Sequence, residues 1–135
     1  MVHVLTGDKG AGKTKKLISM ANELVQDAKG HIVYLSNSSE GMYQLNSKIR
    51  LVNISEFPIS SYDSFIGFLY GMISEDYDIE TIFIDNLNAI ISNNDIVRFF
   101  VDAKKFAELN SVKFVIGAKC EQTAQEGLNI EYMAV

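Results

Sequence analysis

"GDKGAGKT", residues 7–14, is the stretch of this 135-residue chain that says most about its fold. Its informative positions are Gly7, Gly12, Lys13 and Thr14, with four residues between the two glycines. This spacing carries meaning only where a strand precedes the stretch and a helix follows it. The flanking sequence therefore decides how residues 7–14 are interpreted.

Both flanks have that pattern. Residues 2–6, "VHVLT", form a short apolar and β-branched run, typical of a buried strand. From Leu17 to Ala28 apolar side chains recur at helical spacing, and Lys29-Gly30 then supplies a helix stop. "HIVYLS", residues 31–36, predicts a second strand. A strand, a helix and a strand within about 35 residues form a βαβ unit, whose two strands are parallel.

The same alternation continues along the chain. A helix is expected from residue 61 to the acidic run near residue 75, with Ser60 or Ser61 as its cap. Later expected elements are a strand at 81–85, a helix at 94–110 opened by Asn93 or Asn94, and a strand at 112–118. Within the helices, we expect Phe99 and Tyr70 to pack in the core and Arg98 to lie on a helix flank.

Two regions have weaker patterns. Residues 37–60 predict loop and irregular structure, with a short possible strand at 51–54. The last residues predict a short helix followed by an edge strand near 129–134. With these additions the alternation predicts a three-layer α/β/α sandwich with a mostly parallel central sheet, formed by one domain covering residues 1–135.

Composition restricts the class of protein. Hydrophobic residues make up 47% and charged residues 21%, which is typical of a folded globular chain. No apolar run approaches the roughly 20 residues of a membrane span, and the amino terminus leads directly into a strand. We therefore expect a cytoplasmic protein without a membrane span.

The charge and the metal-binding residue types exclude further classes. A net charge of −5 disfavours nucleic acid as a partner, although four lysines between residues 9 and 16 form a local positive focus. With only Cys120, His3 and His31, the chain has neither an internal disulfide nor the spacing of a zinc site. A metal ion would therefore be bound by oxygen atoms.

In its strand-and-helix context the glycine-rich stretch predicts a phosphate-binding loop. Glycines let the backbone wrap closely around an anion, and the N–H groups of the loop and of the helix start point toward it. Lys13 is expected to reach the β and γ phosphates of a nucleotide, and the Thr14 hydroxyl to bind Mg²⁺. The residues expected to bind the nucleotide are Gly7, Asp8, Lys9, Gly10, Ala11, Gly12, Lys13 and Thr14.

A second metal ligand is expected at the end of another buried strand. In "TIFID", residues 81–85, Asp85 follows four residues that would bury the strand. Ligands of open α/β sheets bind at the carboxyl ends of strands, and phosphate loops usually work with an Asp placed there. Asp85 is therefore predicted to hold Mg²⁺ together with Thr14, and to be catalytic together with Lys13.

On these residues the chain resembles the P-loop NTPase superfamily, with "GDKGAGKT" similar to its Walker A motif and "IFID" to its Walker B motif. It looks closest to small single-domain RecA-like ATPases of the additional-strand group, in which an extra strand lies between the two motif strands. It also resembles short bacterial ATP-binding proteins of unknown function, some of which are labelled twitching-motility ATPases. The resemblance implies the P-loop NTPase fold, with ATP and Mg²⁺ as cofactors.

The sequence departs from that group at the position after Asp85. A catalytic Glu often stands there, whereas this chain has Asn86, and an amide cannot accept a proton from water. Glu40 is a candidate replacement, and its alternative is an ordinary surface glutamate. Folds of this kind place a polar sensor residue at the end of the fourth strand, and the resemblance makes Lys119 and Gln122 the candidates for it. The expected activity is a slow ATPase completed by a protein partner or a second subunit.

Other functions stay open at this point. One alternative is a nucleotide-dependent binding or regulatory module without significant hydrolysis. Another is a small-metabolite kinase, which the scarcity of arginine disfavours because only Arg50 and Arg98 are present. "VIGAKCE", residues 115–121, is similar to the guanine-reading signature of small GTPases but differs at Ala118 and Glu121. ATP is therefore the expected nucleotide.

Overall fold

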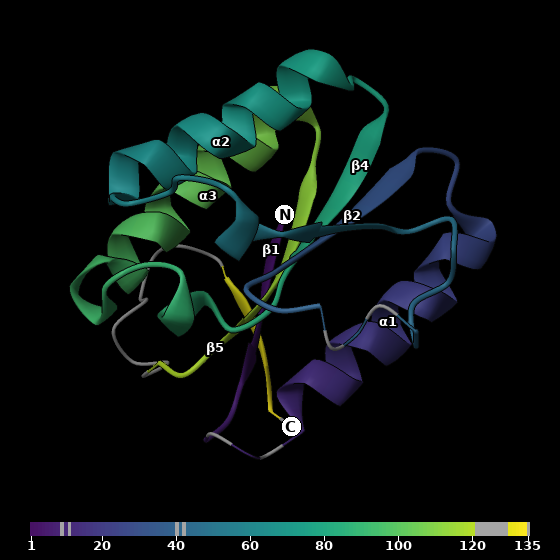
Figure 1. Cartoon of the computed structure of the whole chain (residues 1–135), viewed down its shortest axis with the longest axis horizontal. Coiled ribbons are helices and arrows are strands. Elements are labelled where there is room, and N and C mark those ends of the chain that lie inside the picture. The colour runs from purple at the N-terminus through teal and green to yellow at the C-terminus, as the bar shows by residue number, and fades with distance from the viewer. Residues whose placement is uncertain (9, 11, 40, 42, 121–129, 135) are drawn as a thin grey trace.

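The computed structural model of the chain is an α/β structure in which helices cover both faces of a central sheet (Figure 1). It describes residues 1–8, 10, 12–39, 41, 43–120 and 130–134. The strands are β1 (Val2–Thr6), β2 (His31–Ser36), β3 (Arg50–Asn53), β4 (Ile79–Ile84), β5 (Lys113–Ala118) and β6 (Glu131–Ala134). The α-helices are α1 (Lys13–Asp27), α2 (Tyr62–Glu75) and α3 (Ile96–Asn110), and short 3₁₀ turns occur at Ile54–Glu56, Leu87–Ala89 and Asn93–Asp95.

The six described strands form one sheet in the order β3-β2-β4-β5-β1-β6, and every pair in it is parallel. The predicted α/β/α sandwich is therefore confirmed, with a sheet that is parallel throughout its described strands. β5 lies between β1 and β4, so the strand before the glycine-rich loop and the strand before Asp85 have a common neighbour. This position matches the extra strand that the resemblance implies, while membership of that group stays a prediction.

The helices are unevenly divided between the two faces of the sheet. α1 covers one face, and α2 and α3 lie together on the other (Figure 1). Alternate strand residues serve the two layers, as in β4, where Phe83 packs on the α1 side and Ile82 and Ile84 pack on the α2–α3 side. Because both faces are covered, the central strands are nearly continuous runs of buried apolar residues.

The start of α1 is fixed by two glycines far apart in the sequence. Gly12 caps the helix with φ of 93°, a left-handed conformation that side chains other than glycine rarely adopt. Gly117 in β5 lies beneath Leu17, and a Cβ atom added there would be 2.8 Å from the Leu17 Cδ1 atom. The close approach of α1 to β5 therefore depends on the absence of a side chain at residue 117.

The predicted starts of α2 and α3 had different outcomes. Ser61 caps α2, and its hydroxyl and that of Ser64 form a reciprocal capping box, so the second of the two expected caps is correct. The expectation that Asn93 or Asn94 opens a helix at residue 94 is wrong. The Ser92 hydroxyl accepts the Asn94 N–H and starts a 3₁₀ turn, and α3 begins only at Ile96.

The regions with weak sequence patterns contain the two edge strands. Residues 50–53 form β3, within a segment that is otherwise mostly turns and loop, as expected apart from a one-residue shift of the strand. β6 covers residues 131–134 and pairs with β1, which confirms the expected edge strand. The short helix expected before it falls on residues 121–129, which lie outside the described part of the chain.

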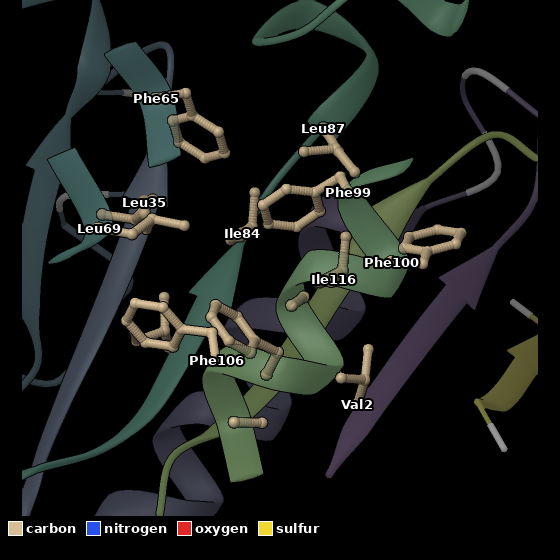
Figure 2. Close-up of a cluster of buried hydrophobic side chains, with 14 of the residues drawn as sticks. Val2, Leu35, Phe65, Leu69, Ile84, Leu87, Phe99, Phe100, Phe106 and Ile116 are labelled. Carbon is tan, nitrogen blue, oxygen red and sulfur yellow. The ribbon is translucent and has the colours of Figure 1, made fainter. Parts of the chain in front are cut away.

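The larger core lies between the sheet and the α2–α3 pair. Figure 2 shows Phe99 among side chains that come from both the sheet and the neighbouring turn. The Phe99 ring is fully buried, with ring centroids 5.5 Å from Phe65 and 6.2 Å from Phe114. Tyr70 contacts Phe106 but is 46% exposed, so core packing is confirmed for Phe99 and only partial for Tyr70. Among the described residues, the helices are too short or too polar to cross a membrane.

Replacing Phe99 by Ala should lower the free energy of unfolding by about 3–5 kcal/mol, because the cavity would lie at the centre of this core. Urea denaturation followed by circular dichroism measures the change. Leu109→Ala is the matched control on the same helix, since Leu109 is 78% exposed, and it should change stability by no more than about 0.5 kcal/mol. Equal losses in the two variants would contradict the packing described here.

Candidate functional site

A pocket of about 930 Å³ opens where β1, β4 and β5 reach their carboxyl ends. The glycine-rich loop and the first turns of α1 form one wall, to which Gly10, Gly12, Lys13, Thr14, Lys15 and Ile18 contribute. The residues that follow β4 form another wall, and Gly41, Gln44 and Lys119 complete the lining. The parallel sheet accounts for this location, because all its strands end at the same edge.

The backbone of the glycine-rich loop takes conformations that are accessible to glycine and strained for other residue types. Gly10 and Gly12 both have left-handed φ values, of 86° and 93°. The Lys13 ammonium group folds back over the loop and donates hydrogen bonds to the backbone oxygens of Gly7 and of Asp8, the latter at 2.9 Å. The loop thus holds a cationic group against its own carbonyl oxygens at the edge of the pocket.

A hydrogen bond between Thr14 and Asp85 joins the first turn of α1 to the end of β4. Thr14 Oγ1 donates to Asp85 Oδ1 at 3.1 Å, across 71 residues of sequence. The Asp85 backbone N–H donates to the Leu35 carbonyl oxygen at 2.8 Å, which continues the pairing of β4 with β2 past the end of the strand. A hydroxyl and a carboxylate oxygen at this separation are ligand types that suit Mg²⁺.

The Asp85 carboxylate is buried, with a residue exposure of 6%. Burial raises its pKa, and this effect is opposed by hydrogen bonds from Thr14 and Tyr34 and by the positive charge of Lys13. Tyr34 OH donates to Asp85 Oδ2 at 3.1 Å, so each carboxylate oxygen accepts a hydrogen bond from a hydroxyl group. Burial and the neighbouring Asp85 also raise the pKa of Tyr34, which keeps its hydroxyl protonated.

The pocket is positively charged although the chain is acidic. Its described lining residues include Lys13, Lys15 and Lys119, against Asp85 as the single carboxylate. Lys119 Nζ also lies 3.9 Å from an Asp8 carboxylate oxygen, so it reaches from the end of β5 toward the glycine-rich loop. A lining with this charge balance favours an anionic ligand.

Three asparagines shape the wall that follows β4. Asn86 directly follows Asp85 with φ of 55°, a left-handed value that asparagine tolerates better than most residues. The Asn88 side chain accepts the Lys119 N–H at 2.8 Å and donates to the Lys119 carbonyl oxygen at 3.1 Å and to Asn93 Oδ1 at 2.9 Å. Asn88 therefore ties the segment after β4 to the end of β5.

Most of the predicted site residues that the structure describes come together at this pocket. Gly10, Gly12, Lys13, Thr14 and Asp85 line it, while Gly7 and Asp8 contribute the backbone oxygens that hold Lys13. Four further candidates, Lys9, Ala11, Glu40 and Gln122, lie outside the described residues.

The two arginines lie elsewhere. Arg98 stacks over the Tyr62 ring at 4.1 Å and pairs with Asp63, which confirms its position on a helix flank. Arg50 lines a separate groove of about 390 Å³ between β3 and α2. Neither guanidinium group belongs to the described lining of the larger pocket.

Sequence reasoning missed Tyr34 and the structural role of Asn88. The signal for Tyr34 was a single hydroxyl within the otherwise apolar run "IVYL". Finding its partner requires knowing that β2 lies beside β4, which local sequence patterns do not reveal.

A search of protein-family models finds no match for the chain, and a search of curated proteins finds none.

A second group of polar side chains lies at the opposite ends of the strands, away from the pocket. His31 begins β2, and its Nδ1 is 2.6 Å from an Asp76 carboxylate oxygen at the end of α2. Asp78 lies close enough that the ligand atoms of all three residues are within 4.8 Å of one another. The hydrogen bond to Asp76 raises the pKa of the largely exposed His31, and it lowers the pKa of Asp76.

This ion pair should give a pH-dependent stability. His31 stabilises the fold fully below its ordinary pKa of 6.5, and the effect is lost as pH rises through the raised pKa of the folded state. Asp76 contributes above its ordinary pKa of 3.8, and its effect is lost as pH falls through the lowered pKa. The melting-temperature advantage of the wild type over His31→Gln should therefore be larger at about pH 5.5 than at about pH 8.5. A gap that widens with rising pH would contradict the pairing.

Proposed function

We propose that this chain binds ATP with Mg²⁺ at the pocket and hydrolyses it slowly until a protein partner or second subunit completes the site. The observation that carries the proposal is the meeting of three features at one sheet edge. They are a glycine loop with left-handed residues, a lysine folded over it, and a hydrogen-bonded Thr14–Asp85 pair.

The loop and Lys13 would bind the phosphates. The backbone N–H groups at the start of α1 and the positive end of that helix attract anions. The Lys13 ammonium is already positioned over the loop by two backbone oxygens, and a bound phosphate would offer it charged oxygen partners. Lys15 and Lys119 add to the attraction from the rest of the lining.

Thr14 and Asp85 would hold the metal ion. Both side chains offer hard oxygen ligands. Their hydrogen bond already brings the start of α1 and the end of β4 together. When bound, Mg²⁺ neutralises charge on the phosphate oxygens. The volume of about 930 Å³ lies within the range of small-molecule sites and leaves room for a nucleoside beside the phosphates.

Slow turnover follows from the residue types around Asp85. Both oxygens of the Asp85 carboxylate already accept a hydrogen bond from a hydroxyl group. The remaining uncharged polar side chains in the described lining carry amides instead of carboxylates, and they are Asn86, Asn88, Asn93 and Gln44. An amide can orient a water molecule but cannot take its proton. Glu40 precedes Gly41, a lining residue, and stays the candidate base of this chain.

The same amides support a second function, a nucleotide-dependent binding module without useful hydrolysis. In that case the nucleotide would set the conformation of the pocket walls, and phosphate release would have no role. A small-metabolite kinase has less support, because both arginines lie away from the described pocket lining.

Thermal melting with nucleotides tests the binding proposal. Mg²⁺ with ATP at about 100 times its dissociation constant should stabilise the wild type by about 2.7 kcal/mol, and GTP should do so only at higher concentration. Lys13→Ala should abolish the shift while the protein still folds. Lys16→Ala is the matched control, since Lys16 is exposed on the same helix and lies outside the pocket lining, and it should keep most of the shift.

Absence of any shift with ATP, ADP or GTP at millimolar concentration would overturn the proposed function. An equal shift in the wild type and Lys13→Ala would place the nucleotide away from the glycine-rich loop. Either result is independent of hydrolysis.

Phosphate release separates the slow ATPase from the binding module. Because Asn86 replaces the glutamate that usually acts as general base, at a cost of at least about a hundredfold, the isolated chain should turn over below about 0.1 s⁻¹ against a typical 10 s⁻¹. Asp85→Asn should reduce this Mg²⁺-dependent rate further. A rate at the level of an Asp85→Asn control, despite tight ATP binding, would favour the binding module.

A further inference from the structure

The Asp85 carboxylate is held from the side of β2 as well as from α1. Tyr34 OH donates to Oδ2 at 3.1 Å, while Thr14 donates to Oδ1. The neighbouring Leu35 accepts the Asp85 backbone N–H at 2.8 Å. Two successive residues of β2 therefore fix both the backbone and the side chain of Asp85.

We propose that Tyr34 is a positioning residue for Mg²⁺, which directs one Asp85 oxygen toward the metal without itself contacting metal or nucleotide. This inference rests on the proposed function and names a residue that controls its metal affinity. Tyr34 does not belong to the pocket lining, so its hydroxyl acts through Asp85.

Tyr34 is rigid enough for this task. The residue is 1% exposed and packs in the core beneath α1. Its ring stacks on Phe83 with centroids 6.0 Å apart and planes 16° apart, and the two residues are direct neighbours in the pairing of β2 with β4. The hydroxyl is thus fixed relative to β4, the strand that ends just before Asp85.

A carboxylate needs such a restraint because rotation about its terminal torsion meets only broad, shallow minima. With Tyr34 bound to Oδ2, the second oxygen, Oδ1, faces Thr14, the other proposed ligand. Without the Tyr34 hydroxyl, Oδ2 would lose its buried donor and the orientation of Oδ1 would loosen. Loss of a hydrogen-bond partner behind a metal ligand typically weakens metal binding about 10–100-fold.

Tyr34→Phe tests the inference, with Tyr62→Phe as a matched control. Tyr62 is also buried, and its hydroxyl donates to Asp102 Oδ2 at 2.6 Å, but it packs on the α2–α3 side and lies outside the pocket lining. Both changes remove the hydroxyl of a buried tyrosine that donates to an aspartate, so both should lower the melting temperature of the free protein. Only Tyr34→Phe should alter the response to metal.

The measurement is the Mg²⁺ concentration that gives half of the ATP-dependent rise in melting temperature, at fixed ATP. Tyr34→Phe should raise this midpoint about tenfold or more, with Mn²⁺ as well as Mg²⁺, and Tyr62→Phe should leave it unchanged. ATP binding measured in EDTA should be equal in all three proteins. In an Asp85→Asn background, Tyr34→Phe should have no further effect on the midpoint.

Each contrary result identifies what is wrong. If Tyr34→Phe keeps the wild-type midpoint while the wild type binds Mg²⁺ and ATP, the positioning role is overturned and the proposed function stands. If the wild type responds to no nucleotide at any Mg²⁺ concentration, the proposed function and this inference both fail. Should Tyr34→Phe not fold, Tyr34→Met supplies a second apolar side chain without the hydroxyl, and the same midpoint is measured.

Discussion

Parallel pairing through β5 is the constraint on which the rest of the structure depends. β5 pairs with β1 on one side and with β4 on the other, in register, over most of its length. Because all three strands run in the same direction, Gly7, Asp85 and Lys119 follow their ends at one edge. The hydrogen bond between Thr14 and Asp85 is a consequence of this pairing, since nothing in the local sequence of either segment brings them together.

The packing of α1 carries this constraint into the glycine-rich loop. α1 is the only described α-helix on its face of the sheet, and its first turns lie over β5, where Leu17 covers Gly117. The start of the helix, and with it Lys13 and Thr14, is therefore placed by core packing as well as by the left-handed Gly12. The loop thus connects a rigid strand to a rigid helix.

Local sequence patterns were sufficient for the βαβ unit, for the loop and for Asp85, because each is encoded within a few neighbouring residues. They were insufficient where the outcome depends on competition or on strand order. Ser92 took the capping role expected of Asn93 or Asn94, whereas the Asn93 side chain instead bonds to Asn88. The contact between Tyr34 and Asp85 depends on β2 lying beside β4, and the order of strands in a sheet cannot be predicted from the periodicity of apolar residues. The roles of nucleotide, metal and Glu40 stay predictions.

The pairing of β1 also affects the order in which the chain folds during synthesis. Among the described strands β1 leaves the ribosome first, yet its two sheet neighbours are β5 and β6, the last two strands described. During translation β2, β3 and β4 can pair early, whereas β1 and the loop behind it wait for residues 113–118. Such long-range contacts slow folding and lengthen the exposure of an apolar strand. The segment with the strongest sequence signal is therefore among the last to be fixed in place.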